Sequence, residues 1–539
     1  MLTLTGTGGI GKTRLALQAA NEVREAYRDG VWFVDLSPLV DPTLVPSALA
    51  QVLGVKEAAG QPLPATLCAH LRGKEVLLIV DNCEQVLAAV ADLAEALLSA
   101  TAKVTLVATS REPLHVGGEQ VYPVAALPVP GRAADAKGIA RSDAVQLFVE
   151  RARAHRPSFD LEGPRARAVA DICVRLDGIP LALELAAARV AVLPVEQIER
   201  LLDQRFRLLT SGSRSDVPRH QTLRAMIDWS YDLLNENERL LLARFSVFAG
   251  GFTLAAAEVV AAGEPIAKDD VVYLLIALVE QSLVVADEDG DRYRMLETVR
   301  EYAREKLNAS GSADTFRTQH RDYFLALAEE AEPNLMGAEE VAWLRRLDEE
   351  HENLRASLEW SVMDTGPSET LRLCGALARF WNTRGYFSEG REWCARVLNH
   401  AGAKKRTAER AKVLNAAGAM AHLQGDYPAA QTWYEERLAL ARELGNKTVI
   451  ASSLVNLGPV HVAQGNVAIA RAMYEEALGM RRDLTDRALV AGMLNNLGNL
   501  VRESGDASDA RALYEESLAI KRELGDKQGI ANTLNNLGL

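Results

Sequence analysis

The sequence predicts an α/β domain with a parallel sheet at the start of the chain, followed by helical domains and an α-solenoid. Two observations carry this prediction. Over residues 1–125, short apolar runs alternate with segments of helical periodicity, as in strands joined by crossover helices. After residue 370 the sequence repeats itself with a period of 40, which indicates stacked helix pairs.

Composition narrows the class of protein further. The 539 residues are 48% hydrophobic and 25% charged, which is typical of a soluble globular chain. The net charge of −13 gives no global sign of nucleic-acid binding, because phosphate backbones would be repelled. Five scattered cysteines without a CxxC pair predict free thiols in a reducing cytoplasm and no zinc site. The longest stretch without charge, residues 448–470, is too polar for a membrane span.

The first motif lies between a short strand over residues 2–5 and a helix that begins at residue 14. The loop between them, GTGGIGKT, fits the pattern G-x-x-x-x-G-K-[ST] in its required context. Glycines let backbone N–H groups face phosphates, and the helix N-terminus adds positive potential. Lys12 should reach the β- and γ-phosphates, and Thr13 should bind Mg²⁺. The predicted nucleotide-binding residues here are Gly6, Thr7, Gly8, Gly9, Ile10, Gly11, Lys12, Thr13 and Arg14.

A second strand supplies the carboxylate that a phosphate loop needs beside Mg²⁺. The unbroken apolar run over residues 76–80 suits a central parallel strand covered on both faces. Asp81 follows this run and is the predicted metal-side carboxylate. Glu84 is the candidate to orient an attacking water, although a plain surface glutamate fits the same position.

Two further apolar runs predict the remaining strands of the sheet, over residues 31–36 and 104–109. Arg111 comes just after the second of them. An arginine at the carboxyl tip of a parallel strand lies where ligands bind in open α/β sheets. Arg111 is therefore a candidate sensor of the γ-phosphate, and an ordinary salt bridge is the alternative.

Four local matches together resemble the NB-ARC-like branch of the STAND NTPases, and in particular bacterial predicted ATPases attached to transcription-factor or cyclase modules. They are the phosphate loop, the strands within LLIVDNCEQV and LVATSREPL, and the segment RLDGIPLALELAAARV, which resembles the family's GLPL element. The resemblance implies that Pro180 packs near adenine. It also implies ATP or ADP with Mg²⁺ as ligands, and a slow ATPase whose catalytic residues would be Lys12, Asp81, Glu84 and Arg111.

The resemblance also implies a domain order and a fold class: a P-loop NTPase with a parallel sheet, then an all-α lid, a winged helix and a tetratricopeptide-like α-solenoid. The expected ranges are 1–130 for the nucleotide-binding domain, 140–212 for the lid, 216–310 for the winged helix, 312–370 for a helical linker and 371–539 for the repeats. Leu296 stands where relatives carry the histidine of a Met-His-Asp motif, which touches the β-phosphate in ADP-bound relatives.

The winged helix raises the question of DNA binding, which charge helps to answer. Residues 216–309 hold 10 basic and 17 acidic residues, a net charge of −7. A module that recognises DNA is expected to be basic on one face. We therefore predict that this winged helix packs on the nucleotide domain and that this segment does not bind DNA directly.

The repeats carry three features at 40-residue spacing. The glycines are Gly385, Gly425, Gly465 and Gly505, with a second set at Gly418, Gly458, Gly498 and Gly538; the Tyr-Glu-Glu triplets begin at Tyr434, Tyr474 and Tyr514. One such unit resembles a tetratricopeptide repeat. One helix pair cannot bury its apolar face alone, so the repeated residues should be core, and the stack should offer a concave groove to a protein or peptide partner. We expect further sequence beyond both ends of this chain.

These inferences predict a regulatory switch. ATP or ADP at the phosphate loop would set the position of the winged helix, and the solenoid would bind a partner that biases this equilibrium. Nucleotide-dependent self-assembly and a transcription output outside this segment are further expectations, with no membrane involved. The alternative is a tetratricopeptide scaffold with a structural, non-hydrolysed nucleotide. Measured turnover, with Asp81→Asn as the control, separates the two hypotheses.

Overall fold

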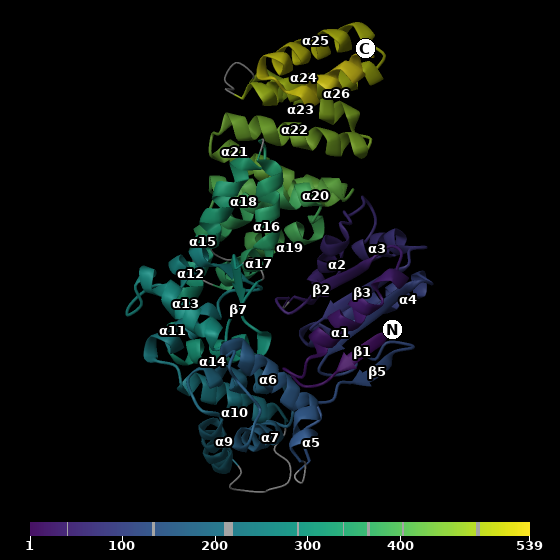
Figure 1. Cartoon of the computed structure of the whole chain (residues 1–539). Helices are drawn as coiled ribbons and strands as arrows, with labels where there is room; N and C mark the ends of the chain where they lie inside the picture. Colours follow the sequence, from purple (N-terminus) through teal and green to yellow (C-terminus); the bar gives the residue numbers. More distant parts are fainter. Residues whose placement is uncertain are drawn as a thin grey trace. The chain divides into compact units, whose positions relative to one another are not determined.

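The computed structural model describes residues 1–539 except 40, 132–134, 210–218, 288–289, 338, 364–366, 401–403, 481–485 and 539, and not the side chains of 203–221 and 367 (Figure 1). The chain forms two compact units. The first comprises Met1–Val55, Leu63–Leu327 and Arg345–Trp360, and the second comprises Lys56–Pro62, Ala328–Leu344 and Ser361–Leu539. The predicted fold class is confirmed: a parallel-sheet α/β domain is followed by a helical lid, a winged helix and an α-solenoid.

The α/β domain is built on a five-stranded sheet of order β2-β3-β4-β1-β5, in which all neighbouring strands are parallel. Its strands are β1 (Leu2–Thr5), β2 (Val31–Asp35), β3 (Val76–Asp81), β4 (Val104–Ser110) and β5 (Gln120–Pro123). The first four match the predicted strands. Because all run in the same direction, the phosphate loop, Asp81 and Arg111 follow strands at the same edge of the sheet.

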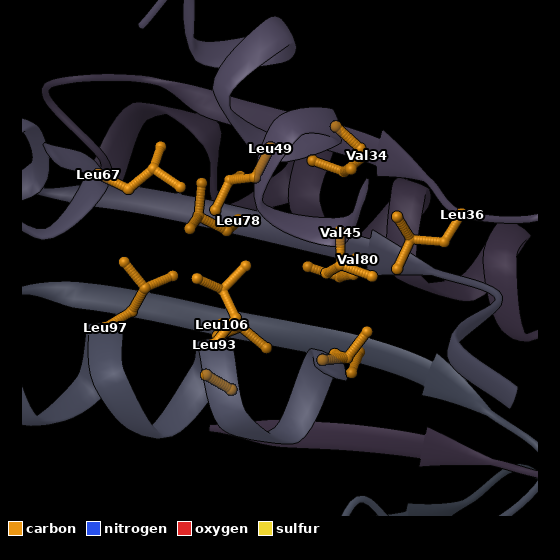
Figure 2. Close-up of a cluster of buried hydrophobic side chains, with 14 of the residues drawn as sticks. Val34, Leu36, Val45, Leu49, Leu67, Leu78, Val80, Leu93, Leu97 and Leu106 are labelled. Atoms are coloured by element: carbon orange, nitrogen blue, oxygen red, sulfur yellow. The ribbon is translucent and has the colours of Figure 1, made fainter. Parts of the chain in front are cut away.

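Strand β3 shows why the central run is apolar without interruption. Successive side chains point to opposite faces of a strand. Leu78 and Val80 join the larger core, where helices α2 (Val45–Leu53), α3 (Leu63–Leu71) and α4 (Leu87–Ala100) cover the sheet (Figure 2). Leu77 and Ile79 join Ala16 and Ala20 of α1 (Lys12–Glu22) on the other face. Helices on both faces thus hold β3 in place and fix the position of Asp81 at its end.

The rest of the first unit is a helical lid and a winged helix. The lid consists of α5 (Ala136–Arg141), α6 (Asp143–His155), α7 (Pro164–Arg175), α8 (Pro180–Ala188) and α9 (Val195–Leu209). The winged helix consists of α10 (Arg219–Asp232), α11 (Glu236–Phe245), α12 (Leu254–Val260), α13 (Val271–Glu280) and α14 (Glu297–Ala309), with a small antiparallel sheet of β6 (Phe252–Thr253), β8 (Arg292–Arg294) and β7 (Val285–Ala286). The predicted boundary at 212–216 lies outside the described residues.

Three helices occupy the range that was predicted to link the switch domains to the solenoid. They are α15 (Ala313–Asn334), α16 (Glu340–Glu349) and α17 (His351–Met363). Within the first unit, His320 of α15 is fully buried and lies within hydrogen-bond distance of Asn353 and Ser357 of α17, at 3.2 and 3.1 Å. Burial lowers the pKa of His320 to about 4, so the imidazole is neutral and serves the packing of these helices.

The solenoid stacks helices in antiparallel pairs. Its helices are α18 (Pro367–Arg384), α19 (Phe387–Asn399), α20 (Ala408–Leu423), α21 (Tyr427–Glu443), α22 (Lys447–Ala463), α23 (Val467–Gly479), α24 (Arg487–Glu503), α25 (Ala507–Leu524) and α26 (Lys527–Leu537). Glycines with positive φ end the first helix of each pair, for example Gly425 at φ 80° and Gly465 at φ 81°. Tyr434, Tyr474 and Tyr514 are at most 4% exposed, so the prediction that the repeated tyrosines form core is confirmed.

The described residues contain neither a metal-binding cluster nor a helix that could span a membrane. Among these residues, no group of three or more His, Cys, Asp or Glu side chains could hold a metal ion. The cysteines are free thiols; four are buried and Cys68 is half-buried. No described helix combines the length and the apolar character that a bilayer crossing requires.

Candidate functional site

The phosphate loop joins β1 to α1 and carries its own structural requirements. Gly9 and Gly11 adopt φ angles of 73° and 97°, a region that favours glycine. Ile10 between them is 4% exposed and would contact a Cβ atom at Gly6 at 3.2 Å, so it anchors the loop to the domain.

Lys12 is the first helical residue, and its ammonium group folds back over the loop. Its Nζ donates to the carbonyl oxygens of Gly6, at 2.8 Å, and of Thr7, at 3.3 Å. The residue is 9% exposed, and burial lowers the pKa of the lysine, with Glu84 and Asp81 opposing that shift. Hydrogen bonds to the loop carbonyls therefore stabilise the buried charge of Lys12. The ammonium group lies where it would contact an anion bound by the loop.

Asp81 lies at the end of β3 beside the hydroxyl of Thr13. Thr13 Oγ1 donates to the two carboxylate oxygens at 2.8 and 3.0 Å, and Thr109 Oγ1 donates to Oδ1 at 2.5 Å. Burial raises the pKa of Asp81, whereas the two threonine hydrogen bonds lower it. The predicted pair of Thr13 and Asp81 is thus in direct contact.

Arg111 extends from the end of β4 and joins two carboxylates. Its Nε donates to Glu84 at 3.1 Å, and its Nη2 lies 3.3 Å from a carboxylate oxygen of Glu301 on α14. Glu84 is therefore paired with the predicted sensor arginine, and its second oxygen, Oε2, is buried without a hydrogen-bond partner among the described residues. Both residues are at the carboxyl edge of the sheet, as expected.

The lid and the winged helix both touch the phosphate loop. The backbone N–H of Leu181 donates to the carbonyl of Gly9 at 3.2 Å, and Pro180 Cγ lies 3.9 Å from the position of a Cβ at Gly11. A Cβ at Gly9 would lie 3.0 Å from Leu223 of α10, and one at Gly8 would lie 3.1 Å from Thr298 Oγ1 of α14. Three domains thus meet at the glycines of one loop.

A cavity of about 700 Å³ opens beside this meeting point. The leading residues of the loop, Gly6 to Gly8, form one wall together with Arg111. Helices α10 and α14 form the other wall, with Arg224, Glu301 and Glu305 among the lining residues. Within that wall Arg224 and Glu305 form an ion pair at 2.6 Å.

Arg14 lies apart from this cluster. Its guanidinium pairs with Glu184 of the lid helix α8 at 3.3 Å, and its side chain is 70% exposed. Glu184 also accepts from Arg151 at 2.9 Å. The role of Arg14 in nucleotide binding stays a prediction, as do the roles of the other residues of the loop.

Sequence reasoning did not single out Thr298, Glu301, Leu181 or Leu223 as site residues. The first two follow the Met-Leu-Glu segment that ends at Glu297, so a helix starting there would place Glu301 one turn after Glu297. The helical spacing therefore predicts that Glu301 lies on the same face of the helix as Glu297. It does not give the partner, because Arg111 is 190 residues away in the chain.

Three domain families match this chain in series. An AAA domain matches residues 1–112, a winged helix-turn-helix domain matches residues 234–308, and a MalT-like TPR region matches residues 376–536. The order of these matches agrees with the order of the domains in the structure.

Similar proteins come from Mycobacterium tuberculosis H37Rv. Rv0890c, named as an HTH-type transcriptional regulator, is 39% identical over 468 residues, which cover 85% of this chain and 51% of the relative. This chain therefore spans about half the length of that relative. The uncharacterized protein Rv0894 is 37% identical over 329 residues, covering 60% of this chain and 80% of that protein.

A solved structure shares the architecture. The STAND protein PH0952 from Pyrococcus horikoshii, described with a tetratricopeptide repeat sensor, aligns with a TM-score of 0.53 at 15% identity, covering 99% of this chain and 77% of that chain. This likeness shows the fold. The chain belongs to the same family as Rv0894, and it carries, in this order, matches to an AAA domain, a winged helix-turn-helix domain and a MalT-like TPR region.

Proposed function

We propose that this chain is a nucleotide-dependent regulatory switch whose solenoid binds a protein partner. The observation that carries the proposal is the junction at the phosphate loop. The Cβ positions of Gly8, Gly9 and Gly11 lie 2.9–3.9 Å from side chains of the winged helix and the lid, which are Thr298, Leu223, Leu181 and Pro180. A ligand bound by this loop would change the surface that the lid and the winged helix contact. The ligand would then make different contacts in two arrangements of these domains, and such a difference is what allows a ligand to shift an equilibrium.

The residues present fit a magnesium-bound adenine nucleotide. The buried Lys12 ammonium contacts carbonyl oxygens of the loop. The Thr13 hydroxyl and the Asp81 carboxylate, 2.8 Å apart, are the oxygen donors that Mg²⁺ prefers. Bound Mg²⁺ would neutralise charge on the phosphates during slow ATP hydrolysis. In this scheme Lys12 binds phosphate oxygens, and the Asp81 carboxylate orients Mg²⁺.

Glu84 and Arg111 have narrower roles in the proposal. The pair lies at the carboxyl edge near Lys12, whose pKa responds to both side chains. Arg111 would face the terminal phosphate, because ligands bind outside the carboxyl ends of the strands in open α/β sheets. Glu84 would hold the guanidinium in place, and its buried, unpaired Oε2 could accept a hydrogen bond from water.

The solenoid offers uncharged polar groups to a partner. Asparagines recur on the first helix of successive pairs, and they bond across the repeats: Asn456 Nδ2 donates to Asn415 Oδ1 at 2.8 Å, and Asn536 Nδ2 donates to Asn495 Oδ1 at 3.1 Å. A side-chain amide carries both donors and acceptors, as a peptide main chain does. We therefore propose a protein or peptide ligand for this surface.

A cavity at the start of the solenoid supports the same proposal. It measures about 340 Å³, and Asn382, Lys412 and Asn415 line it. The Oδ1 atom of Asn382 is buried and has no hydrogen-bond partner among the described residues. A donor from a ligand would satisfy that atom.

Transcription control as the output is proposed from the name of Rv0890c.

Replacement of Lys12 tests the nucleotide site. We expect Lys12→Ala to weaken binding of Mg-ADP and Mg-ATP by about 100-fold, because a charged hydrogen bond to phosphate contributes about 1.5–3 kcal/mol and each 1.4 kcal/mol is tenfold. Isothermal titration calorimetry on the full chain measures both affinities. Lys103→Ala is the matched control, since Lys103 is exposed and pairs with Glu75 on the same domain.

Two results would count against the site. One is a Lys12→Ala protein that binds ADP as tightly as the parent. The other is equal weakening by Lys103→Ala, which would indicate a general loss of structure.

A further inference from the structure

The cavity at the start of the solenoid is lined by residues of three helices, all of them within the second unit. It measures about 340 Å³. Among its lining residues, Arg379 and Asn382 come from α18, Lys412 and Asn415 from α20, and Glu332 from α15. Two cations, one acid and two amides thus line one hollow, so its charge depends on how these groups pair.

The two cations differ in their pairing. Lys412 Nζ lies 2.5 Å from a carboxylate oxygen of Glu332, and its stem packs against α18 at Gly375, where a Cβ atom would lie 3.0 Å from Lys412 Cδ. The Nε atom of Arg379 donates to the carbonyl of Leu335 at 2.8 Å, and no carboxylate of the described residues pairs with this guanidinium. The cavity therefore carries one uncompensated positive charge, and the Nη groups of Arg379 are its donors.

An acceptor without a donor lies beside this guanidinium. Asn382 follows Arg379 by about one turn of α18, and residues at this spacing are neighbours on a helix surface. Its Oδ1 atom is buried and has no hydrogen-bond partner among the described residues. Satisfying both groups takes an anion for the arginine and an N–H donor for the amide oxygen. The last residue of a peptide carries both, because its carboxylate and its main-chain N–H are attached to the same Cα atom.

The position of the cavity favours a chain end over an acidic side chain. Asn456 Nδ2 donates to Asn415 Oδ1 at 2.8 Å, so a row of amides leads from α22 to the cavity. At the cavity the row meets the end of α15, where Glu332 and Leu335 accept hydrogen bonds from side chains of α20 and α18. A peptide that follows the amides would end at this helix, which places its terminal carboxylate in the cavity.

We propose that this cavity binds the C-terminal carboxylate of a partner protein. The inference rests on the proposed binding of a protein or peptide by the solenoid. Arg379 pairs with the carboxylate through its Nη groups, and Asn382 Oδ1 accepts a hydrogen bond from the main-chain N–H of the terminal residue. The amides of Asn415 and Asn456 are then available to the peptide groups that precede it.

Peptides that differ only at the C-terminus test the proposal on the unmodified chain. An array of short random peptides is anchored by the N-termini, and each sequence is presented once with a free carboxylate and once as the amide. The strongest binders of either form are then measured as acid and amide by fluorescence anisotropy. We expect the free acid to bind at least about tenfold more tightly, because one hydrogen bond to a charged group accounts for about a factor of ten or more.

Two arginines of one helix separate this site from general charge. Arg379→Gln removes the uncompensated cation. Arg372→Gln is the matched control, because Arg372 lies about two turns earlier on α18, pairs with Glu329 at 2.7 Å and lies outside the described lining of the cavity. We expect Arg379→Gln to weaken binding of the free acid to the level of the amide, and the control to leave the ratio of the two affinities unchanged.

The failures can be told apart. If no peptide binds in either form, the peptide ligand proposed for the solenoid and this inference are both overturned, whereas the nucleotide site is tested separately through Lys12. If peptides bind equally well as acid and amide, only the inference about the carboxylate is overturned. N-acetylalanine that binds as tightly as the peptides would also overturn it, because a small carboxylate would then suffice. The comparison of acid and amide uses the parent chain, so it decides the matter even if Arg379→Gln does not fold.

Discussion

A single glycine of the phosphate loop can serve both ligand binding and domain packing. A backbone that approaches phosphate closely needs residues without side chains. In this chain the missing side chains also make room for other domains, since Leu181 and Leu223 lie 2.9 and 3.0 Å from the position of a Cβ at Gly9. The same residue therefore serves ligand access and domain closure, and a substitution there should affect both.

Gly9→Ala tests this double role. Its φ of 73° makes a left-handed alanine cost about 1–2 kcal/mol, and the new Cβ would lie 2.9 Å from Leu181 Cβ. We expect a larger loss of unfolding free energy than in Gly54→Ala, where φ is 65° but no atom lies within 4 Å of the Cβ position. Urea denaturation measures the difference. Equal losses in the two variants would show that the contacts at Gly9 contribute nothing.

The sequence predicts the site only as far as local pattern reaches. Lys12, Thr13 and Asp81 follow from a motif and a strand end, and the structure brings them into contact. Arg111 and Glu84 lie at the predicted edge, but their pairing needed the structure. Glu301 could not be placed, because its partner depends on how the winged helix packs on the sheet.

Among the elements, the buried strands are the most predictable and the edge strand the least. Residues covered on two faces must be apolar, so β3 reads as an unbroken run. Strand β5 was not predicted. Its four residues, Gln120–Pro123, are all exposed, so neither alternation nor an apolar run marks it. It joins the sheet by main-chain pairing with β1, a property that side-chain pattern does not report.

The helix pairs of the solenoid depend on a contact between glycine and tyrosine. A Cβ at Gly418, Gly458 or Gly498 would lie 2.2–2.8 Å from the nearest ring atom of Tyr434, Tyr474 or Tyr514. The glycine of the first helix thus receives the ring of the second, and both recur every 40 residues. This contact explains why the repeat keeps a weak helix former inside each first helix.

Gly458→Ala should therefore destabilise the solenoid although alanine is the better helix former. The added Cβ would lie 2.2 Å from the Tyr474 ring, and overpacking of this kind costs about 1–3 kcal/mol. Gly492→Ala is the control inside α24, because no atom lies within 4 Å of its Cβ position. It should stabilise by up to about 1 kcal/mol. Thermal denaturation followed by circular dichroism compares them, and a stabilised Gly458→Ala would refute the contact.

At the scale of the whole molecule, the division into two compact units separates two kinds of core. The first unit holds the sheet, the lid and the winged helix, whose contacts meet at the phosphate loop. The second holds a stack in which each helix pair packs on its neighbours, as the clusters around Tyr434 and Tyr474 show. A ligand that binds one unit should then stabilise that unit and shift only its unfolding transition.

Calorimetry of the full chain tests that separation. We expect two unfolding transitions, and Mg-ADP at 100 times its dissociation constant should stabilise the first unit by about 2.7 kcal/mol, because it binds only the folded site. At the same ADP concentration Lys12→Ala should reduce this shift to about 0.4 kcal/mol, because its binding is expected to be about 100-fold weaker. Gly458→Ala should lower only the transition of the solenoid. The two variants therefore assign the transitions independently of the ligand. A single transition under all conditions would argue against two units, and a solenoid transition that ADP raises more than the other would place the nucleotide outside the phosphate loop.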